Sequence, residues 1–271
     1  MKIYISADME GISGIVDWEY TSSERYDYSR ARKLMTGDVN AAIQGAVRAG
    51  ADQIIVNDSH NSMNNILLEE LLAPASLLSG APKMNSMMEG IDSTCDGVAL
   101  IGYHAMMNST GVLNHTFSSL SVYSLKLNGR ETGELGLSAY IAGYFNVPVV
   151  MVSGDDQLSE EAQAFVPGVK TAEVKEARGR FAAICRNLAE ARGLIADRMY
   201  EAILSRNSIK PVKIEGPVTI EVALQNGAMA DAAQIMPGAE RVGSTTVQFT
   251  APDILVAYRA FRTITSLASH A

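Results

Sequence analysis

The N-terminal stretch Met1–Gly14, MKIYISADMEGISG, determines how the rest of the chain is expected to fold. Its largely apolar run Ile3–Ala7 predicts a buried strand, and Asp8 and Glu10 follow directly. Because side chains alternate along a strand, both carboxylates face the same side, where they repel each other and lose solvation. A cation, or a proton held on one of them, relieves that repulsion. The alternative is that Asp8 caps a following turn while Glu10 reaches water.

Apolar runs and helical repeats alternate through the first part of the chain. Further short buried strands are predicted at residues 52–56, 97–101 and 147–153. Helices are predicted at residues 29–50, 61–72 and 133–144, the first from apolar residues at three- and four-residue intervals that end at a glycine. Alternation of this kind is typical of βαβ units. The sequence therefore predicts an α/β fold with a central, mostly parallel sheet and helices on both faces.

The pattern changes near residue 172. The elements predicted beyond it are a long helix at residues 177–205, a strand within 211–224, a helix at 225–236, a strand at 242–250 and a terminal helix at 252–269. We therefore expect residues 1–170 to form the larger α/β domain and residues 171–271 a smaller α/β or α+β subdomain packed on it. No Pro- or Ser-rich linker marks the boundary.

Composition excludes several classes of partner. The chain has 271 residues, 47% of them hydrophobic, which is enough for a sizeable core. Its net charge of −8 and the lack of a Lys/Arg-rich run argue against nucleic acid or an anionic membrane surface as a partner. We expect no signal peptide and no membrane-spanning segment. Cys95 and Cys185 are expected to be free thiols in a reducing cytoplasm, with a disulfide as the alternative.

Acidic residues and histidines follow the predicted strands. The carboxyl ends of parallel strands meet at one edge of a sheet, and ligands bind there in open α/β sheets. The residues expected at this edge are Asp8, Glu10, His60, His104 and Glu134, with His115 on the loop beyond. Two imidazoles and three carboxylates suit zinc, manganese or iron, and the oxygens suffice for two ions about 3.5–4 Å apart that share a carboxylate. The alternative is that each histidine only caps its own turn.

Six short motifs resemble those of the zinc-dependent D-aminopeptidases associated with bacterial dipeptide-transport operons. They occur in the family's order and are SADMEGISG (6–14), VNDSH (56–60), GYH (102–104), NH (114–115), GELG (133–136) and VSGDD (152–156). The resemblance spans nearly the whole chain. It implies a two-zinc peptidase that removes N-terminal D-residues such as D-alanine from short peptides. It also implies a cytoplasmic homo-decamer whose active sites face an internal channel.

The resemblance also implies roles for individual residues. The positions that match the family's metal ligands are Asp8, Glu10, His60, His104 and Glu134. His115 matches the catalytic histidine, either as a proton donor to the leaving amine or as a nucleophile. We expect Asp8 to bridge the two ions, because it lies deepest on its strand. Residues 118–130 and 172–213 depart from the family pattern, which leaves the choice of substrate open.

The residues themselves are compatible with two other functions. A dinuclear metal phosphoesterase would use the same ions to clamp a phosphoryl group, although the predicted site lacks an Arg cluster or a Gly-rich phosphate loop. A non-catalytic α/β module would bind a small ligand at the same edge of the sheet. Metal-dependent amide hydrolysis is the leading hypothesis, since an imidazole that is not needed as a ligand is well suited to proton transfer near neutral pH.

Overall fold

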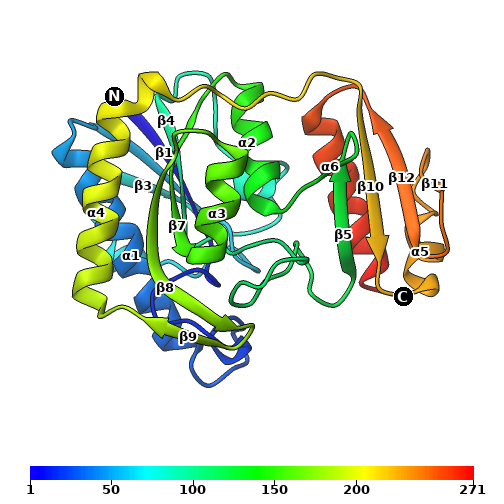
Figure 1. The fold of residues 1–271 in the computed structure, drawn as a ribbon, viewed down its shortest axis with the longest axis horizontal. Coiled ribbons are helices and arrows are strands. Elements are labelled where there is room, and N and C mark those ends of the chain that lie inside the picture. The colour runs from blue at the N-terminus through cyan, green and yellow to red at the C-terminus, as the bar shows by residue number, and fades with distance from the viewer.

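The computed structural model describes residues 1–271 and contains two β-sheets (Figure 1). The larger sheet has seven strands in the spatial order β3-β2-β1-β4-β7-β8-β9. Neighbouring strands are parallel throughout, except that β9 is antiparallel to β8. In chain order these strands are β1 Lys2–Ala7, β2 Gln53–Asp58, β3 Ala75–Leu78, β4 Gly97–Ile101, β7 Val149–Asp155, β8 Lys170–Gly179 and β9 Ala182–Cys185.

Helices cover both faces of the larger sheet (Figure 1). Their bounds are α1 Tyr28–Arg48, α2 Glu134–Tyr144, α3 Asp156–Phe165 and α4 Leu188–Ser205. α1 and α4 pack against each other on one face, and α3 packs on β7 and β8 next to α2 on the other. α1 buries the apolar repeat that predicts it, including Leu34, Val39 and Ile43. The expectation of a mostly parallel sheet with helices on both faces is confirmed.

β1 lies in the interior of the larger sheet, between β2 and β4, and every residue from Ile3 to Ala7 is buried. Since helices cover both faces, the strand is mostly apolar on both sides instead of alternating. The strand order reverses between β1 and β4, because the chain moves outward from β1 through β2 to β3 and then returns to the other side of β1. Such a reversal opens a crevice beyond the carboxyl ends of the two strands, where ligands bind in α/β sheets.

The smaller sheet is antiparallel, with the strand order β11-β12-β10-β5-β6. Its strands are β5 Val122–Leu127, β6 Arg130–Glu131, β10 Val218–Leu224, β11 Glu240–Arg241 and β12 Thr246–Ala251. β10 alternates buried and half-buried residues, which is typical of a sheet with one face on the core. The helix α6 Ile254–Ala268 packs on this sheet and also contacts α2, and the short α5 Gly227–Ala233 lies beside α6. α6 therefore joins the two sheets (Figure 1).

The two sheets do not divide at the expected boundary near residue 170. β8, which begins at Lys170, and β9 complete the larger sheet, although they lie at and beyond this boundary. β5 and β6 precede the boundary but belong to the smaller sheet. Both sheets therefore draw on both parts of the chain. The division into domains of residues 1–170 and 171–271 stays a prediction.

Two of the predicted helices are wrong in extent. Residues 177–205 begin with the end of β8 and the whole of β9, because the open edge of β7 accepts β8 as a parallel neighbour and β8 turns back into β9. Residues 61–72 form a loop whose helical part is only the single turn η2 Leu68–Glu70, because the buried Asp58 carboxylate accepts the backbone N–H groups of the loop. The other single turns are η1 Trp18–Tyr20, η3 Ser86–Met88 and η4 Arg206–Ser208. None of the helices combines the length and apolar character that crossing a membrane requires.

Candidate metal and active site

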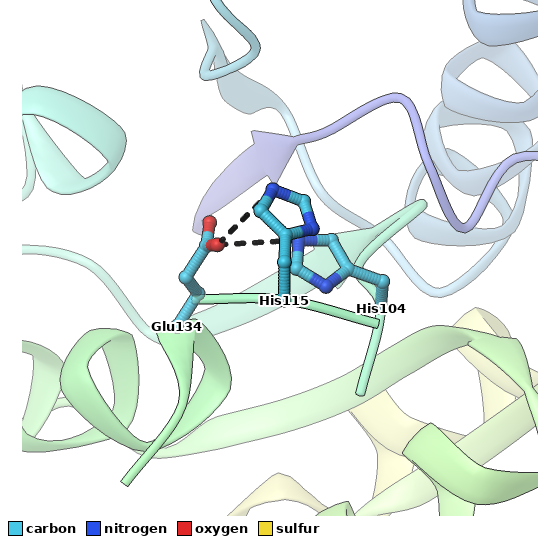
Figure 2. Close-up of side chains that lie close together, drawn as sticks. All are labelled: His104, His115 and Glu134. Atoms are coloured by element: carbon cyan, nitrogen blue, oxygen red, sulfur yellow. Dashed lines mark ion pairs between the residues drawn. The ribbon is translucent and has the colours of Figure 1, made fainter. Parts of the chain in front are cut away.

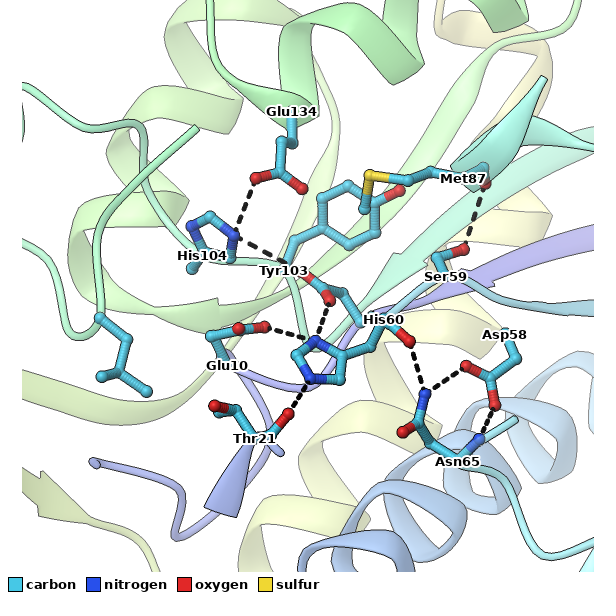
Figure 3. Close-up of polar contacts among 12 residues, drawn as sticks. Glu10, Thr21, Asp58, Ser59, His60, Asn65, Met87, Tyr103, His104 and Glu134 are labelled. Atoms are coloured by element: carbon cyan, nitrogen blue, oxygen red, sulfur yellow. Dashed lines mark hydrogen bonds and ion pairs between the residues drawn. The ribbon is translucent and has the colours of Figure 1, made fainter. Parts of the chain in front are cut away.

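All six predicted site residues converge beyond the ends of β1 and β4. Figure 3 shows four of them, Glu10, His60, His104 and Glu134. They are Asp8 and Glu10 after β1, His60 after β2, His104 after β4, His115 on the loop between β4 and β5, and Glu134 at the start of α2. None of them is more than 7% exposed. All except His104 line a cavity of about 500 Å³. The reversal of strand order thus brings together residues that are up to 126 positions apart in the sequence.

Two glycines allow the loops after β1 and β4 to touch. The N–H of Gly11 donates a hydrogen bond of 2.8 Å to the carbonyl oxygen of Gly102. A Cβ on Gly11 would collide with the carbonyl oxygen of Tyr103, and a Cβ on Gly102, whose φ is +70°, would collide with that of Asp8. Only glycine permits such a close approach of two backbones. This contact fixes the spacing between the carboxylates on one loop and His104 on the other.

His60 is held with one ring nitrogen towards the carboxylates (Figure 3). Its Nε2–H donates to the carbonyl oxygen of Thr21 at 2.7 Å. Its Nδ1 lies 3.2 Å from Asp8 Oδ1 and 3.0 Å from Glu10 Oε2. Because a carbonyl oxygen only accepts, Nε2 carries a proton, and Nδ1 is the nitrogen that can face a cation.

His104 is held in the same manner. Its Nδ1–H donates to the carbonyl oxygen of Ala105 at 3.1 Å. Its Nε2 lies 3.5 Å from Asp8 Oδ2 and 3.2 Å from Glu134 Oε1. Metal-binding histidines are typically oriented by a hydrogen bond from the nitrogen that does not bind the metal. Asp8 therefore turns one oxygen to each of two histidines that are both oriented in this way.

His115 forms part of the cavity wall beside His104. The two rings are stacked, with centroids 4.0 Å apart and an angle of 8° between their planes. The Nδ1–H of His115 donates to the carbonyl oxygen of Leu113 at 2.8 Å, and its Nε2 lies 3.9 Å from Glu134 Oε1 (Figure 2). The edge of the Trp18 ring packs on His115, with centroids 5.4 Å apart. His115 is therefore a fixed ring whose Nε2 carries the free lone pair.

The carboxylates and His104 leave buried polar atoms unpaired. Asp8 Oδ2, Glu10 Oε2 and His104 Nε2 have no hydrogen-bond partner, which is rare for buried polar groups. Burial raises the pKa of Asp8, and the charge of Glu10 raises it further, to about 7. Ligand atoms of Asp8, Glu10 and His104 lie within 4.8 Å of one another, as do those of His104, His115 and Glu134. This set of oxygen and nitrogen donors fits divalent zinc.

The three site histidines differ in charge. Burial lowers the pKa of His104, but the neighbouring carboxylates of Glu134 and Asp8 outweigh burial and raise this pKa to about 10. Burial also opposes protonation of His60, and the neighbouring Glu10 and Asp8 again raise its pKa. For His115, burial and the positive charge of His104 act together and lower the pKa to about 4. His115 is therefore uncharged at neutral pH and able to accept a proton.

Known proteins match this chain over nearly its whole length. The profile of a family described as D-aminopeptidase matches residues 1–263. The chain belongs to the D-aminopeptidase family. A D-aminopeptidase of Bacillus subtilis (strain 168) is 41% identical over 269 residues, which cover 99% of this chain and 98% of that protein. The structure of the Zn-dependent D-aminopeptidase DppA from Bacillus subtilis, a self-compartmentalizing protease, matches with a TM-score of 0.98 and 40% identity, covering 100% of this chain and 99% of that one.

Membership of the D-aminopeptidase family confirms the resemblance carried by the six motifs, and with it a hydrolase that acts on peptide bonds. The segment 118–130, which the sequence predicts to depart from the family pattern, begins at the site. Three of its residues line the cavity, and they are Ser118, Ser119 and Leu120. The start of this segment therefore forms part of the cavity wall.

Backbone strain is concentrated around the same cavity. Seven residues other than glycine have a positive φ, and five of them line the cavity or contact His115. These five are Asn61, Met63, Ser86, Leu113 and Phe117. Strained residues of this kind persist where the surrounding structure fixes them, and they cluster at functional sites. At Leu113 the unusual φ of 52° accompanies the carbonyl group that orients the ring of His115.

The sequence does not single out the residue that anchors the loop of Glu10. The buried Nζ of Lys175, on β8, donates to the carbonyl oxygens of Glu10, Ile12 and Ile15 at 2.6, 3.2 and 2.5 Å. Burial lowers the pKa of Lys175 to about 8. Lys175 directly follows Val174 in the mostly polar segment KTAEVKEARG, and a lysine in such a segment normally faces solvent. Three backbone acceptors explain its burial here.

Proposed function

We propose that this chain is a zinc-dependent aminopeptidase that releases N-terminal D-amino acids, such as D-alanine, from short peptides. The observation that carries the proposal is the convergence of three carboxylates and two imidazoles, with unpaired buried atoms, at the crevice between β1 and β4. Family membership supports it, because a relative is named D-aminopeptidase and the matching structure is described as Zn-dependent. The adjoining cavity of about 500 Å³ has the size of a small-ligand site.

Five residues would hold two zinc ions. They are Asp8, Glu10, His60, His104 and Glu134. Asp8 is suited to bridge the ions, because its Oδ1 faces His60 and its Oδ2 faces His104. Glu10 lies beside His60 and Glu134 beside His104, so each ion would gain one imidazole and one further carboxylate. When bound, zinc supplies a Lewis acid that polarises a carbonyl group and lowers the pKa of water.

His115 would transfer the proton during hydrolysis. Its Nδ1–H is held by the Leu113 carbonyl, and its lowered pKa keeps Nε2 unprotonated at neutral pH. Nε2 can therefore accept a proton and later donate it to the leaving amine. The stacked ring of His104 and the edge of Trp18 keep this nitrogen in place. Nucleophilic attack by the same nitrogen is the alternative, and a covalent adduct found by mass spectrometry after rapid quenching would favour it.

The test is hydrolysis of D-Ala p-nitroanilide, its L-isomer and p-nitrophenyl phosphate, each with and without zinc. We expect zinc-dependent release of p-nitroaniline from the D-isomer and not from the L-isomer. Zinc-dependent release of p-nitrophenol would instead favour a dinuclear phosphoesterase. Inactivity on all three compounds would favour a ligand-binding module without catalysis.

The proposal extends to assembly and compartment. A cytoplasmic homo-decamer with its active sites on an internal channel is supported by the matching DppA structure, which is described as self-compartmentalizing. Large apolar side chains that are exposed on the single chain, such as Tyr26 and Ile235, are available for contacts between subunits. Cys95 and Cys185 are free thiols, as suits a reducing compartment. Light scattering should give ten times the chain mass of 29.0 kDa, and a monomer would contradict the assembly.

A further inference from the structure

Arg262 is the only lysine or arginine that lines the cavity beside the proposed zinc site. It projects from α6 and is half-buried. Its Nη1–H donates to the carbonyl oxygen of Lys83 at 2.9 Å, which fixes the guanidinium group. Arg262 takes part in none of the chain's ion pairs, and its other N–H groups donate to no protein atom. Its fork of donors therefore keeps the capacity to bind a carboxylate.

Opposite charges line the cavity from different parts of the fold. The three site carboxylates come from the loop after β1 and from the start of α2, whereas Arg262 comes from the helix on the smaller sheet. This helix reaches the site through Phe117, whose N–H donates to Glu134 Oε1 and whose ring packs edge-on against Phe261. A short peptide also carries opposite charges at its two ends. Its ammonium group would lie towards the carboxylates and its terminal carboxylate towards Arg262.

No other lysine or arginine lines the cavity. The Nζ donors of the buried residues Lys83 and Lys175 are each taken by three protein oxygens. Arg259 lies one turn before Arg262 on α6, but it is exposed and donates to Asn85. It lines a separate hollow of about 380 Å³, which Arg262 also borders, and not the cavity of the site. Arg262 is therefore the single lysine or arginine in the wall of the cavity.

We propose that Arg262 binds the C-terminal carboxylate of the substrate and so selects short peptides with a free C-terminus. This inference rests on the proposed aminopeptidase function and adds a specificity-determining residue to it. A guanidinium group binds a carboxylate through two parallel hydrogen bonds, and partial burial strengthens the contact relative to an exposed ion pair. A peptide that is amidated, or too long for the cavity, leaves Arg262 without this partner.

The first measurement needs no variant. D-Ala-Gly and D-Ala-glycinamide differ only in the terminal carboxylate, and their hydrolysis by the zinc-loaded protein is followed by the release of glycine or glycinamide. We expect kcat/KM to be ~10- to 100-fold higher for the acid, mainly through KM, because a hydrogen bond to a charged group contributes about this much to binding. Equal values for the two peptides would overturn the role of Arg262 and leave the aminopeptidase function standing. No hydrolysis of either peptide or of D-Ala p-nitroanilide would overturn both.

Variants test whether the preference resides in Arg262. Arg262→Met should lower kcat/KM for the acid to the level of the amide and leave the amide value nearly unchanged. Arg262→Lys keeps the positive charge but lacks the two parallel N–H donors of the guanidinium group. It should retain part of the preference for the acid over the amide. Arg259→Met is the matched control, since it makes the same change on the same helix outside the cavity, and we expect it to change neither value. An equal loss on both peptides in Arg262→Met would limit the residue to packing and overturn the proposal.

Equilibrium binding provides a measurement that is independent of turnover. D-Ala-Gly is titrated calorimetrically into the His115→Ala protein, with and without Arg262→Met. We expect the second substitution to raise Kd for D-Ala-Gly by ~10-fold or more and to leave Kd for D-Ala-glycinamide unchanged. The same Kd for the acid in both proteins would contradict the contact.

Discussion

The ring of His115 lies flat on the ring of His104, and each donates one N–H to a backbone carbonyl. At a centroid distance of 4.0 Å, a charge on one imidazole opposes a charge on the other. Glu134 raises the pKa of His104 to about 10 in spite of burial, and burial together with the charge of His104 then lowers that of His115 to about 4. One ring is thus adapted to the cation site and its neighbour to proton transfer, and removing each ring separately tests this division.

His115→Ala should abolish hydrolysis of D-Ala p-nitroanilide and leave the zinc content unchanged. Loss of a general acid or base typically lowers kcat by about 10²–10⁴-fold. His104→Ala is the contrasting variant and should lose zinc as well, because its Nε2 faces Asp8 and Glu134. Metal analysis alongside the kinetics separates the two roles. If His115→Ala also loses its zinc, His115 is a ligand and the proposed role is wrong.

Asp8→Asn should stabilise the metal-free protein but reduce the stability that the protein gains from zinc. Burial and Glu10 raise the folded-state pKa of Asp8 from 3.8 to about 7, so ionisation of Asp8 destabilises the metal-free protein increasingly between about pH 3.8 and pH 7 and fully above pH 7. At pH 8 with a chelator, the Asn variant should therefore melt at a higher temperature than the wild type. At free zinc of ~100 times Kd, the wild type should gain about 3 kcal/mol and the variant much less. A zinc-induced shift in Tm that is equal in both proteins would contradict a ligand role for Asp8.

Lys175→Met should loosen the loop that carries Glu10. Three carbonyl oxygens lose a buried donor, and each buried polar group left unpaired costs about 1–3 kcal/mol. Removal of the buried charge of Lys175 offsets part of this cost, so we expect the free energy of unfolding to fall by about 2–5 kcal/mol. Zinc affinity should fall by ~10- to 100-fold, as is typical when a residue that supports a metal ligand is removed. Lys170→Met, on the same strand, is the control, because Lys170 makes no side-chain hydrogen bond. Urea unfolding and chelator competition measure both effects, and unchanged zinc affinity would exclude a positioning role.

Glu161→Gln should stabilise the protein at alkaline pH. Burial raises the pKa of Glu161 from 4.5 to about 7, although its carboxylate accepts the N–H of Met106 at 2.9 Å. In the wild type, the ionised carboxyl destabilises the fold increasingly between about pH 4.5 and pH 7 and fully above pH 7. At pH 8.5 the free energy of unfolding of the Gln variant should therefore exceed that of the wild type by about 1–3 kcal/mol, and at pH 4.5 the two should be nearly equal. The lower end of this range allows for the partial exposure of Glu161. Urea unfolding at both pH values measures this difference in stability. A stabilisation found only at the lower pH would refute the prediction.

The parallel sheet and its polar edge can be predicted because the signals are local. His60 and His104 each follow a short apolar run that predicts a strand. Because the carboxyl ends of parallel strands lie at one edge of the sheet, both histidines are predicted to lie there. The hairpin of β8 and β9 lacks such a signal. Lys175 interrupts its apolar pattern, and pairing with the open edge of β7 selects strand over helix.

Residues that support the site or meet its substrate depend on contacts between distant parts of the chain. Lys175 binds a backbone group 165 positions away, and Arg262 is fixed by one 179 positions away. A lysine or arginine in an ordinary amphipathic element is normally solvated, so neither residue type nor spacing distinguishes these two. Their roles become visible only when the acceptors in the folded chain are known.

β5 and β6 come from the first part of the chain but belong to the smaller sheet, and this affects recombination between related genes. A chimera joined near residue 170 would combine strands of different parents within both sheets. The residues that line its cavity would then come from two parent proteins. To transfer the substrate specificity of a relative to this chain, the segment 116–131 and residues 211–271 must be exchanged together. Diversification of this scaffold by crossover is therefore expected to need two coordinated exchanges, whereas point substitutions face no such restriction.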